Sequence, residues 1–204
     1  MIKALSSTLL ATALLLAPAA LAQTPAAPTP AALPDLSHLN PQVAAAAQTA
    51  RDTERQAEDA AARARDVARE ASRARGENFT NGVGATTTHR GDRFAGSFAN
   101  GAFDGFGVYS FAVGSTDRYE GQFKAGAMEG FGIYYWRDGS HYAGTSTPAG
   151  QTSPGVHVLA DGRRFEGTWA NDKRNGPGVE WSADGHVLRA GLWTDNQLTT
   201  PLSP

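Results

Sequence analysis

The sequence predicts a mainly β protein: an elongated single-layer array of antiparallel β-hairpin repeats, preceded by a long Ala-rich α-helix. Three observations support this fold class. Beyond residue 77, aromatic residues and glycines recur in fixed columns every 23 to 25 residues. Asp-Gly pairs, which favour tight hairpin turns, close several of the repeats. Within residues 41–76, small apolar residues recur in steps of three and four, which is the spacing of one helix face.

Residues 1–22 have the order of a secretory signal peptide. Lys3 precedes an apolar run from Ala4 to Leu16, and the small residues Ala20 and Ala22 follow, with a cleavage point before Gln23. We therefore expect an exported chain, in the periplasm or the extracellular space. A signal retained as a membrane anchor is the alternative.

Two short segments carry little that could form a core. Residues 23–40 are rich in proline and alanine, and such composition favours a disordered linker. The last residues, 199–204, are expected to form a disordered tail. The folded part is therefore predicted to consist of the helix and a repeat domain at residues 77–198.

The helix is predicted over residues 41–76. Pro41 suits the first helical turn, and Gly76 lies where a C-terminal capping glycine belongs. The apolar seam follows an a/d heptad register, and it consists of Val43, Ala46, Ala50, Thr53, Ala57, Ala60, Ala64, Val67, Ala71 and Ala74. Three interpretations remain open. The helix is a solvated spacer, or a coiled coil that joins copies into a homo-oligomer through residues 43–74, or an element that docks onto the repeats or another protein.

The repeat units start near residues 94, 119, 142 and 165, and half-units flank them at both ends. Strand alternation places the leading aromatic residue and the glycine two residues later on one face, where the glycine leaves room for a ring. The columns that we assign to this structural role are Phe94, Gly96, Gly105, Gly107, Tyr119, Gly121, Gly130, Gly132, Tyr142, Gly144, Gly155, Phe165, Gly167, Gly176 and Gly178. One hairpin has too small an apolar face to fold alone, so neighbouring units are expected to stack.

The segment YEGQFKAGAMEGFGIYYWRDGSHY, residues 119–142, resembles the MORN (membrane occupation and recognition nexus) repeat. The units at Phe94 and Phe165 are similar to it. The unit at Tyr142 departs from the pattern around its turn, with Pro148 and Ala149. The resemblance implies a curved sheet of hairpins with an aromatic-lined groove, of bacterial exported type. It also implies a scaffold or targeting module, because enzymes that contain such repeats carry their chemistry in a separate domain.

No residue pattern indicates catalysis, a cofactor or a metal site. The chain has no cysteine, and its five histidines are scattered. The Gly-x-Gly pairs lack the residues of a phosphate-binding loop. Glu120 and Glu166 recur singly, one place after the leading aromatic residue, so a structural or solvating role explains them better than paired carboxylate catalysis.

The charge of the chain limits the classes of partner. The formal net charge is −2, and acidic residues also outnumber basic ones within the repeats. Nucleic acids and anionic membranes attract clustered basic residues, so nucleic-acid binding is not expected and general membrane binding is disfavoured.

These observations predict an exported, non-catalytic scaffold or adaptor that binds a protein partner through exposed aromatic residues. Rings on the second strands and turns are the candidates for this surface, since exposed aromatic side chains favour recognition; they are Phe103, Phe106, Phe131, Tyr135, Trp136 and Trp169. A module that binds cell-wall glycan is the alternative function. A carboxylate-dependent hydrolase is the second alternative.

Overall fold

The structure is a computed structural model that describes residues 33–74, 80–112 and 115–202. The chain divides into Met1–Leu33 and Pro34–Pro204, and the second unit contains every element described below. The single helix of the described residues is α1, Pro41–Ala71. The strands are β1 Gly82–Thr87, β2 Arg93–Ala99, β3 Ala102–Ser110, β4 Arg118–Lys124, β5 Ala127–Tyr135, β6 His141–Thr147, β7 Gly150–Val158, β8 Arg164–Ala170, β9 Lys173–Trp181, β10 Val187–Thr194 and β11 Gln197–Pro201.

The 11 strands form one sheet in sequence order, and each strand pairs antiparallel with the next. Every repeat forms a hairpin, which confirms the predicted mainly β fold class. The third unit also forms its hairpin, β6–β7, despite its different turn. Pro148 cannot adopt the positive φ of the turn residues Ala125 and Gly126 in the second unit, and Gly150 instead takes a φ of 110°.

The aromatic and glycine columns meet on one face of the sheet. Tyr119 lies against the paired glycines Gly121 and Gly132, and a Cβ atom at Gly132 would lie 2.5 Å from Cζ of that tyrosine. A contact of this length is impossible, so only glycine fits beneath the ring. The same arrangement places the other leading rings over glycine pairs: Phe94 over Gly96 and Gly107, Tyr142 over Gly144 and Gly155, and Phe165 over Gly167 and Gly178.

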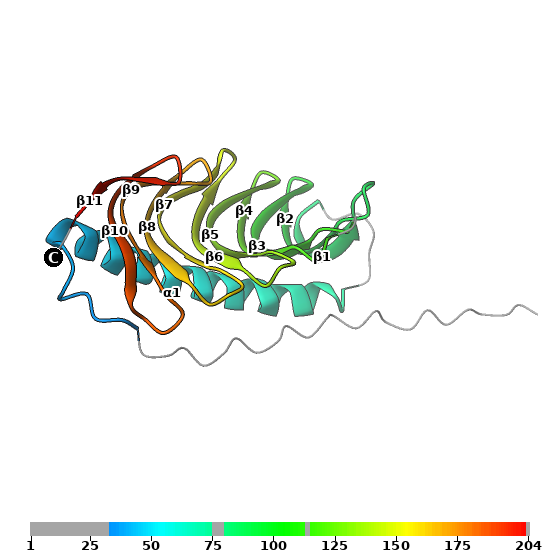
Figure 1. The fold of residues 1–204 in the computed structure, drawn as a ribbon. Helices are drawn as coiled ribbons and strands as arrows, with labels where there is room; N and C mark the ends of the chain where they lie inside the picture. Colours follow the sequence, from blue (N-terminus) through cyan, green and yellow to red (C-terminus); the bar gives the residue numbers. More distant parts are fainter. Residues whose placement is uncertain (1–32, 75–79, 113–114, 203–204) are drawn as a thin grey trace, which may run out of the picture. The chain divides into compact units, whose positions relative to one another are not determined.

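The helix α1 packs across the opposite face of the sheet (Figure 1) and contacts every strand from β1 to β10. Asn40 caps its N-terminus by accepting a hydrogen bond from the Gln42 amide. A helix of 31 residues is roughly 46 Å long, and ten strands span about 43 Å. The helix therefore has the length needed to cover ten strands.

The heptad seam of α1 matches the repeat of the sheet. Val43 packs with Val179 of the fourth unit, and Ala57, two heptads later, packs with Ile133 of the second unit. One heptad advances about 10.5 Å along a helix, and one hairpin advances about 9.6 Å across a sheet. Small alanine side chains permit this close contact, so each repeat unit meets one heptad of the helix.

Ion pairs to buried carboxylates follow the same step. Arg51 donates to Glu166 of the fourth unit, with Nε 3.0 and 2.9 Å from the two carboxylate oxygens. Arg65, two heptads later, donates to Glu120 of the second unit at 2.5 Å. Arg164 joins the first pair by binding both Glu166 and Glu54. These contacts hold the helix in one register on the sheet.

The structure corrects several expectations about the segments around the repeats. The helix was predicted to reach residue 76, but α1 ends at Ala71, and Ala74 is exposed beyond it. Most of the seam is covered by the chain's own sheet, so the coiled coil and the homo-oligomer through residues 43–74 do not fit this structure, and α1 adds a second layer to the sheet. Within the linker, Leu39 is buried against Val43 and Trp181. Residues 199–201 are not a tail, because they pair with β10 as part of β11. The signal peptide (residues 1–22), residues 23–32 and Gly76 lie outside the described residues.

Candidate binding surface

The two faces of the sheet differ in what covers them. Glu120 and Ile133 point toward α1. We call the side of the sheet that α1 covers the helix face. Strand alternation places Tyr119 on the other side. We call this other side the aromatic face and define it by its leading rings, Phe94, Tyr119, Tyr142 and Phe165.

The leading rings belong to a ladder of edge-to-face contacts. Four residues after a leading position, a second ring packs against the leading ring of its own unit and that of the preceding unit. Phe123, for example, contacts Tyr119 at 5.3 Å and Phe94 at 5.0 Å between ring centroids. The remaining contacts of this type have centroid distances of 5.2 or 5.3 Å, and they join Phe94 with Phe98, Tyr142 with Trp169, Phe165 with Trp169, and Phe165 with Trp193.

The ladder is interrupted in the third unit. Ser146 occupies the position that carries Phe98, Phe123, Trp169 and Trp193 in the other units and the final half-unit. Tyr119 and Tyr142 flank this position, and each has only one of the two ring neighbours that Phe94 and Phe165 have. One aromatic ring is therefore missing from a periodic series.

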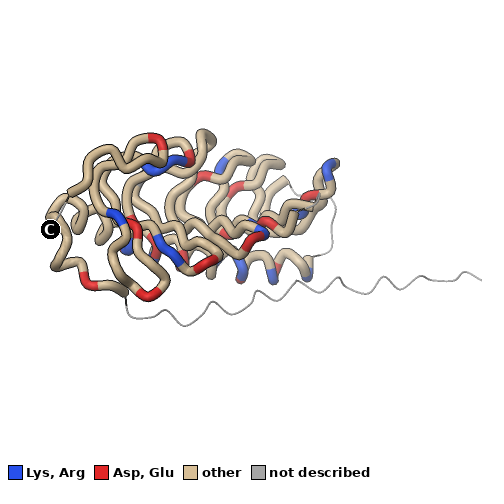
Figure 2. Tube along the Cα trace, viewed as in Figure 1, with Lys and Arg blue, Asp and Glu red and all other residues tan. Residues whose placement is uncertain are grey.

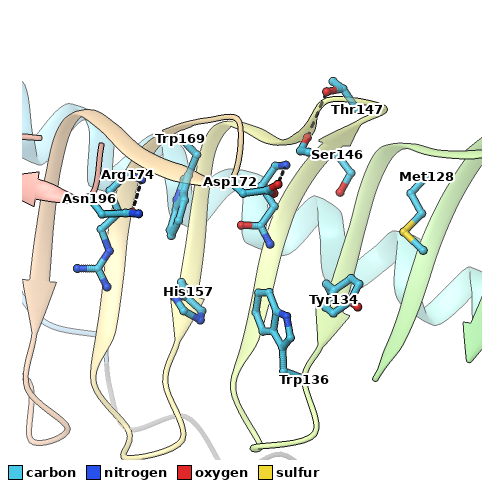
Figure 3. Close-up of a pocket in the computed structure, with 12 residues that line it drawn as sticks. Met128, Tyr134, Trp136, Ser146, Thr147, His157, Trp169, Asp172, Arg174 and Asn196 are labelled. Carbon is cyan, nitrogen blue, oxygen red and sulfur yellow. Dashed lines mark hydrogen bonds between the residues drawn. The ribbon is translucent and has the colours of Figure 1, made fainter. Parts of the chain in front are cut away.

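Two neighbouring hollows open on the aromatic face around the third unit. The larger has a volume of about 670 Å³ and is lined by Ser146, with Met128 and Trp169 on its two sides (Figure 3). The smaller has a volume of about 570 Å³ and includes Phe103. Both hollows share the β6–β7 turn at Thr147 and Gly150. The surface is thus hollowed where the ring ladder is incomplete.

A second row of rings borders the larger hollow. Tyr134 and Trp136 have centroids 4.9 Å apart, and His157 lies 5.2 Å from Trp136 and 5.9 Å from Trp169 (Figure 3). Burial, followed by the nearby charge of Arg174, lowers the pKa of His157 from 6.5 to about 4. His157 is therefore a neutral ring at pH 7 that packs between two indoles.

Most polar groups at the larger hollow are already bound within the sheet. The Asp172 carboxylate accepts from the Gln151 amide at 2.7 Å, and the Asn196 side chain accepts from the Arg174 amide at 2.9 Å. The Thr147 hydroxyl donates to the Gly150 carbonyl at 3.2 Å. The rest of the lining consists of aromatic rings, Met128 and the polar side chains of Ser146, Gln151 and Arg174.

The six rings predicted to bind a partner divide between the two faces. Phe103, Trp136 and Trp169 lie on the aromatic face and line the hollows. The other three lie on the helix face: Phe106, which packs beneath the guanidinium of Arg63, Phe131, two residues from Ile133 on the same strand, and Tyr135, which packs with Ala57 and Ala61. The sequence prediction missed the hollow's other lining residues, including Tyr134, Ser146 and His157.

The single carboxylates do not face the hollows. Glu120 is 2% exposed and Glu166 is 0% exposed, and both are bound by arginines on the helix face. Their role in this structure is structural, and they are not solvated. Glu180, on the aromatic face, is buried and bound by Arg163, Arg174 and Arg189.

Basic and acidic residues are interspersed along α1 and across the strands (Figure 2). Over the described ranges, the structure has no group of three His, Asp or Glu side chains placed to hold a metal ion. Within these same ranges, α1 is too polar to cross a membrane.

The comparison with protein families matches the MORN repeat at residues 94–116, 119–141 and 165–187. The comparison with curated proteins gave no match. The family match passes over residues 142–164, which form the third hairpin with its altered turn and its serine in the ring ladder. MORN repeats are generally non-catalytic and mediate interactions with proteins or membrane lipids. The chain therefore contains three MORN repeats, with a divergent hairpin inserted between the second and third.

Proposed function

We propose that this chain is a non-catalytic scaffold that binds a protein partner through the aromatic face. One observation carries the proposal: the chain's own helix covers one face of the sheet, whereas the other face retains two hollows bordered by rings. Trp136 and Tyr134 are partly exposed beside the larger hollow. Large aromatic side chains in such positions contribute strongly to protein–protein binding.

A pull-down with matched variants on opposite faces tests this proposal. The full chain, Trp136→Ser and Phe131→Ser serve as baits for a cell-envelope extract, and bound proteins are identified by mass spectrometry. Trp136→Ser should reduce capture by roughly 30-fold, because loss of a central aromatic residue costs about 2 kcal/mol of binding. Phe131→Ser, on the helix face, should retain the partner. Equal capture by all three baits, or loss only with Phe131→Ser, would remove the support for the aromatic face.

The proposal includes export, with the repeats acting in the periplasm or outside the cell. The charged start, apolar run and small residues of segment 1–22 support it. N-terminal sequencing of the chain recovered from the cell envelope should begin at Gln23. A chain that keeps Met1 and stays in the cytosol is the contrary result.

A further inference from the structure

We infer that the break in the ring ladder at Ser146 is a specific slot for one aromatic side chain of a protein partner. This inference rests on the proposed function and identifies the chemistry that the aromatic face recognises. The slot is the part of the larger hollow above Ser146, between Met128 and Trp169 (Figure 3).

The periodicity of the sheet indicates the shape of the occupant. At four equivalent positions, the chain supplies its own ring: Phe98, Phe123, Trp169 and Trp193. Each of these rings packs edge-to-face on a leading ring with centroids 5.0 to 5.3 Å apart. At Ser146 the strand backbone continues in the same register, but the side chain fills only a small part of the ring's volume. A planar aromatic group from another molecule would complete the series.

The walls of the slot favour an aromatic side chain over a sugar. Indole and phenol rings border it, and Met128 adds a thioether, which packs favourably against aromatic rings. A sugar needs several free hydrogen-bonding groups around its hydroxyls. Asp172, Thr147 and Asn196 already have partners within the turns of the sheet. Ser146, Gln151 and Arg174 are the other polar side chains of the lining, and Arg174 is paired with Glu180. The rings and the Met128 thioether form the apolar part of the slot, and this part matches a ring with few polar groups.

The third unit differs from its neighbours in the features that create the slot. Its turn contains Pro148, and its ladder position contains Ser146. The residue paired with the ladder position is Gln151, where the other units have Phe103, Met128 and Arg174. The loss of the ladder ring at Ser146 leaves the hollow, while the hairpin itself is retained. The divergent unit is therefore the recognition unit of the array.

The four tryptophans allow a direct test by NMR. The full chain is titrated with the peptide acetyl-Gly-Trp-Gly-amide, and the indole N–H signals are followed. Trp136 and Trp169 line the slot, whereas Trp181 lies beneath α1. We expect the signals of Trp136 and Trp169 to shift and that of Trp181 to stay in place. Acetyl-Gly-Leu-Gly-amide and the disaccharide of N-acetylglucosamine are the comparison probes, and neither should shift the two indoles.

Variants at Ser146 test whether the slot itself is occupied. Ser146→Phe supplies the missing ring from within the chain and should weaken binding of the tryptophan peptide by about tenfold. Ser146→Ala leaves the slot open and should bind as the wild type does. Ser146→Leu is a second filling variant, and thermal unfolding shows which variants are folded.

Three results would overturn the inference: no shift with the tryptophan peptide, an equal shift in Ser146→Phe, or a shift with the disaccharide alone, which would assign the hollow to a sugar. The pull-down separates this failure from failure of the proposed function. A partner that is lost with Trp136→Ser but kept with Ser146→Phe leaves the aromatic face as the binding surface and removes the slot.

Discussion

The two faces of this sheet are built from the same repeat, yet they are stabilised in different ways. On the helix face, α1 supplies one heptad per repeat, and arginines bind the buried carboxylates Glu120 and Glu166. On the aromatic face, rings contact one another from unit to unit, and no second layer is present among the described residues. One face is therefore completed within the chain, while the other stays accessible where its ladder is interrupted.

The largest expected effect lies on the helix face. Glu166→Ala leaves the buried guanidinium of Arg51 and the partly buried one of Arg164 without their shared carboxylate, and it should lower the free energy of unfolding by about 3–5 kcal/mol. Urea denaturation measures this change. Glu129→Ala is the matched control, because its pair with Lys124 is exposed and should contribute less than about 1 kcal/mol. Similar losses in both variants would show that the pair at Glu166 is not buried in solution.

A smaller effect should appear on the aromatic face as a pH dependence. The unfolded chain binds a proton at His157 near pH 6.5, whereas the folded chain binds it only near pH 4. The unfolded state therefore holds more protons between these values, so stability is complete above pH 6.5 and falls as the pH decreases toward 4. We expect a loss of about 1–3 kcal/mol from this group.

The control for this prediction is His157→Gln, which cannot titrate. Thermal unfolding of both chains is measured from pH 7 to pH 4. The carboxylates are the same in both chains, so the difference between the two curves gives the contribution of His157. The wild type should lose more stability than the variant across this window. Parallel curves would show that His157 is not buried between Trp136 and Trp169.

The smallest expected effect is a gain in stability. Ser146→Phe completes the ring ladder between Tyr119 and Tyr142, and it should raise the free energy of unfolding by about 0.5–1.5 kcal/mol. Chemical denaturation measures the gain. Ser97→Phe, in the first unit and next to Phe98 on the strand, adds a ring on the helix face outside the ladder and should bring no such gain. If Ser146→Phe destabilises the chain, the hollow does not have the shape of the missing ring.

The contrast between the faces also explains what the sequence could and could not predict. Seven of the ten residues of the predicted heptad seam are buried, whereas Thr53 and Val67 are partly exposed and Ala74 lies beyond the end of α1. The seam packs on the sheet, because a heptad and a hairpin advance by nearly the same distance. A repeating seam alone does not identify the surface it meets. The charged residues contained a further signal. Arg51 and Arg65 are two heptads apart on the helix, and their partners Glu166 and Glu120 are two repeats apart on the sheet.

The aromatic residues show a similar limit. Strict alternation along β5 places Phe131, Ile133 and Tyr135 on one face, so the candidate rings could have been divided between the faces from the sequence. Ser146 was visible as a departure from its column. Its consequence, a hollow bordered by Trp136 and Trp169, depends on how neighbouring hairpins stack in three dimensions.

A double-mutant cycle on Arg51 and Glu166 tests most directly that the helix covers one face and leaves the other accessible. The two residues are 115 positions apart in the chain and meet only if α1 is docked on β8. Urea denaturation of Arg51→Ala, Glu166→Ala and the double variant should give a coupling energy above about 1.5 kcal/mol. Additivity of the two single changes within about 0.5 kcal/mol would mean that α1 does not cover the sheet in solution.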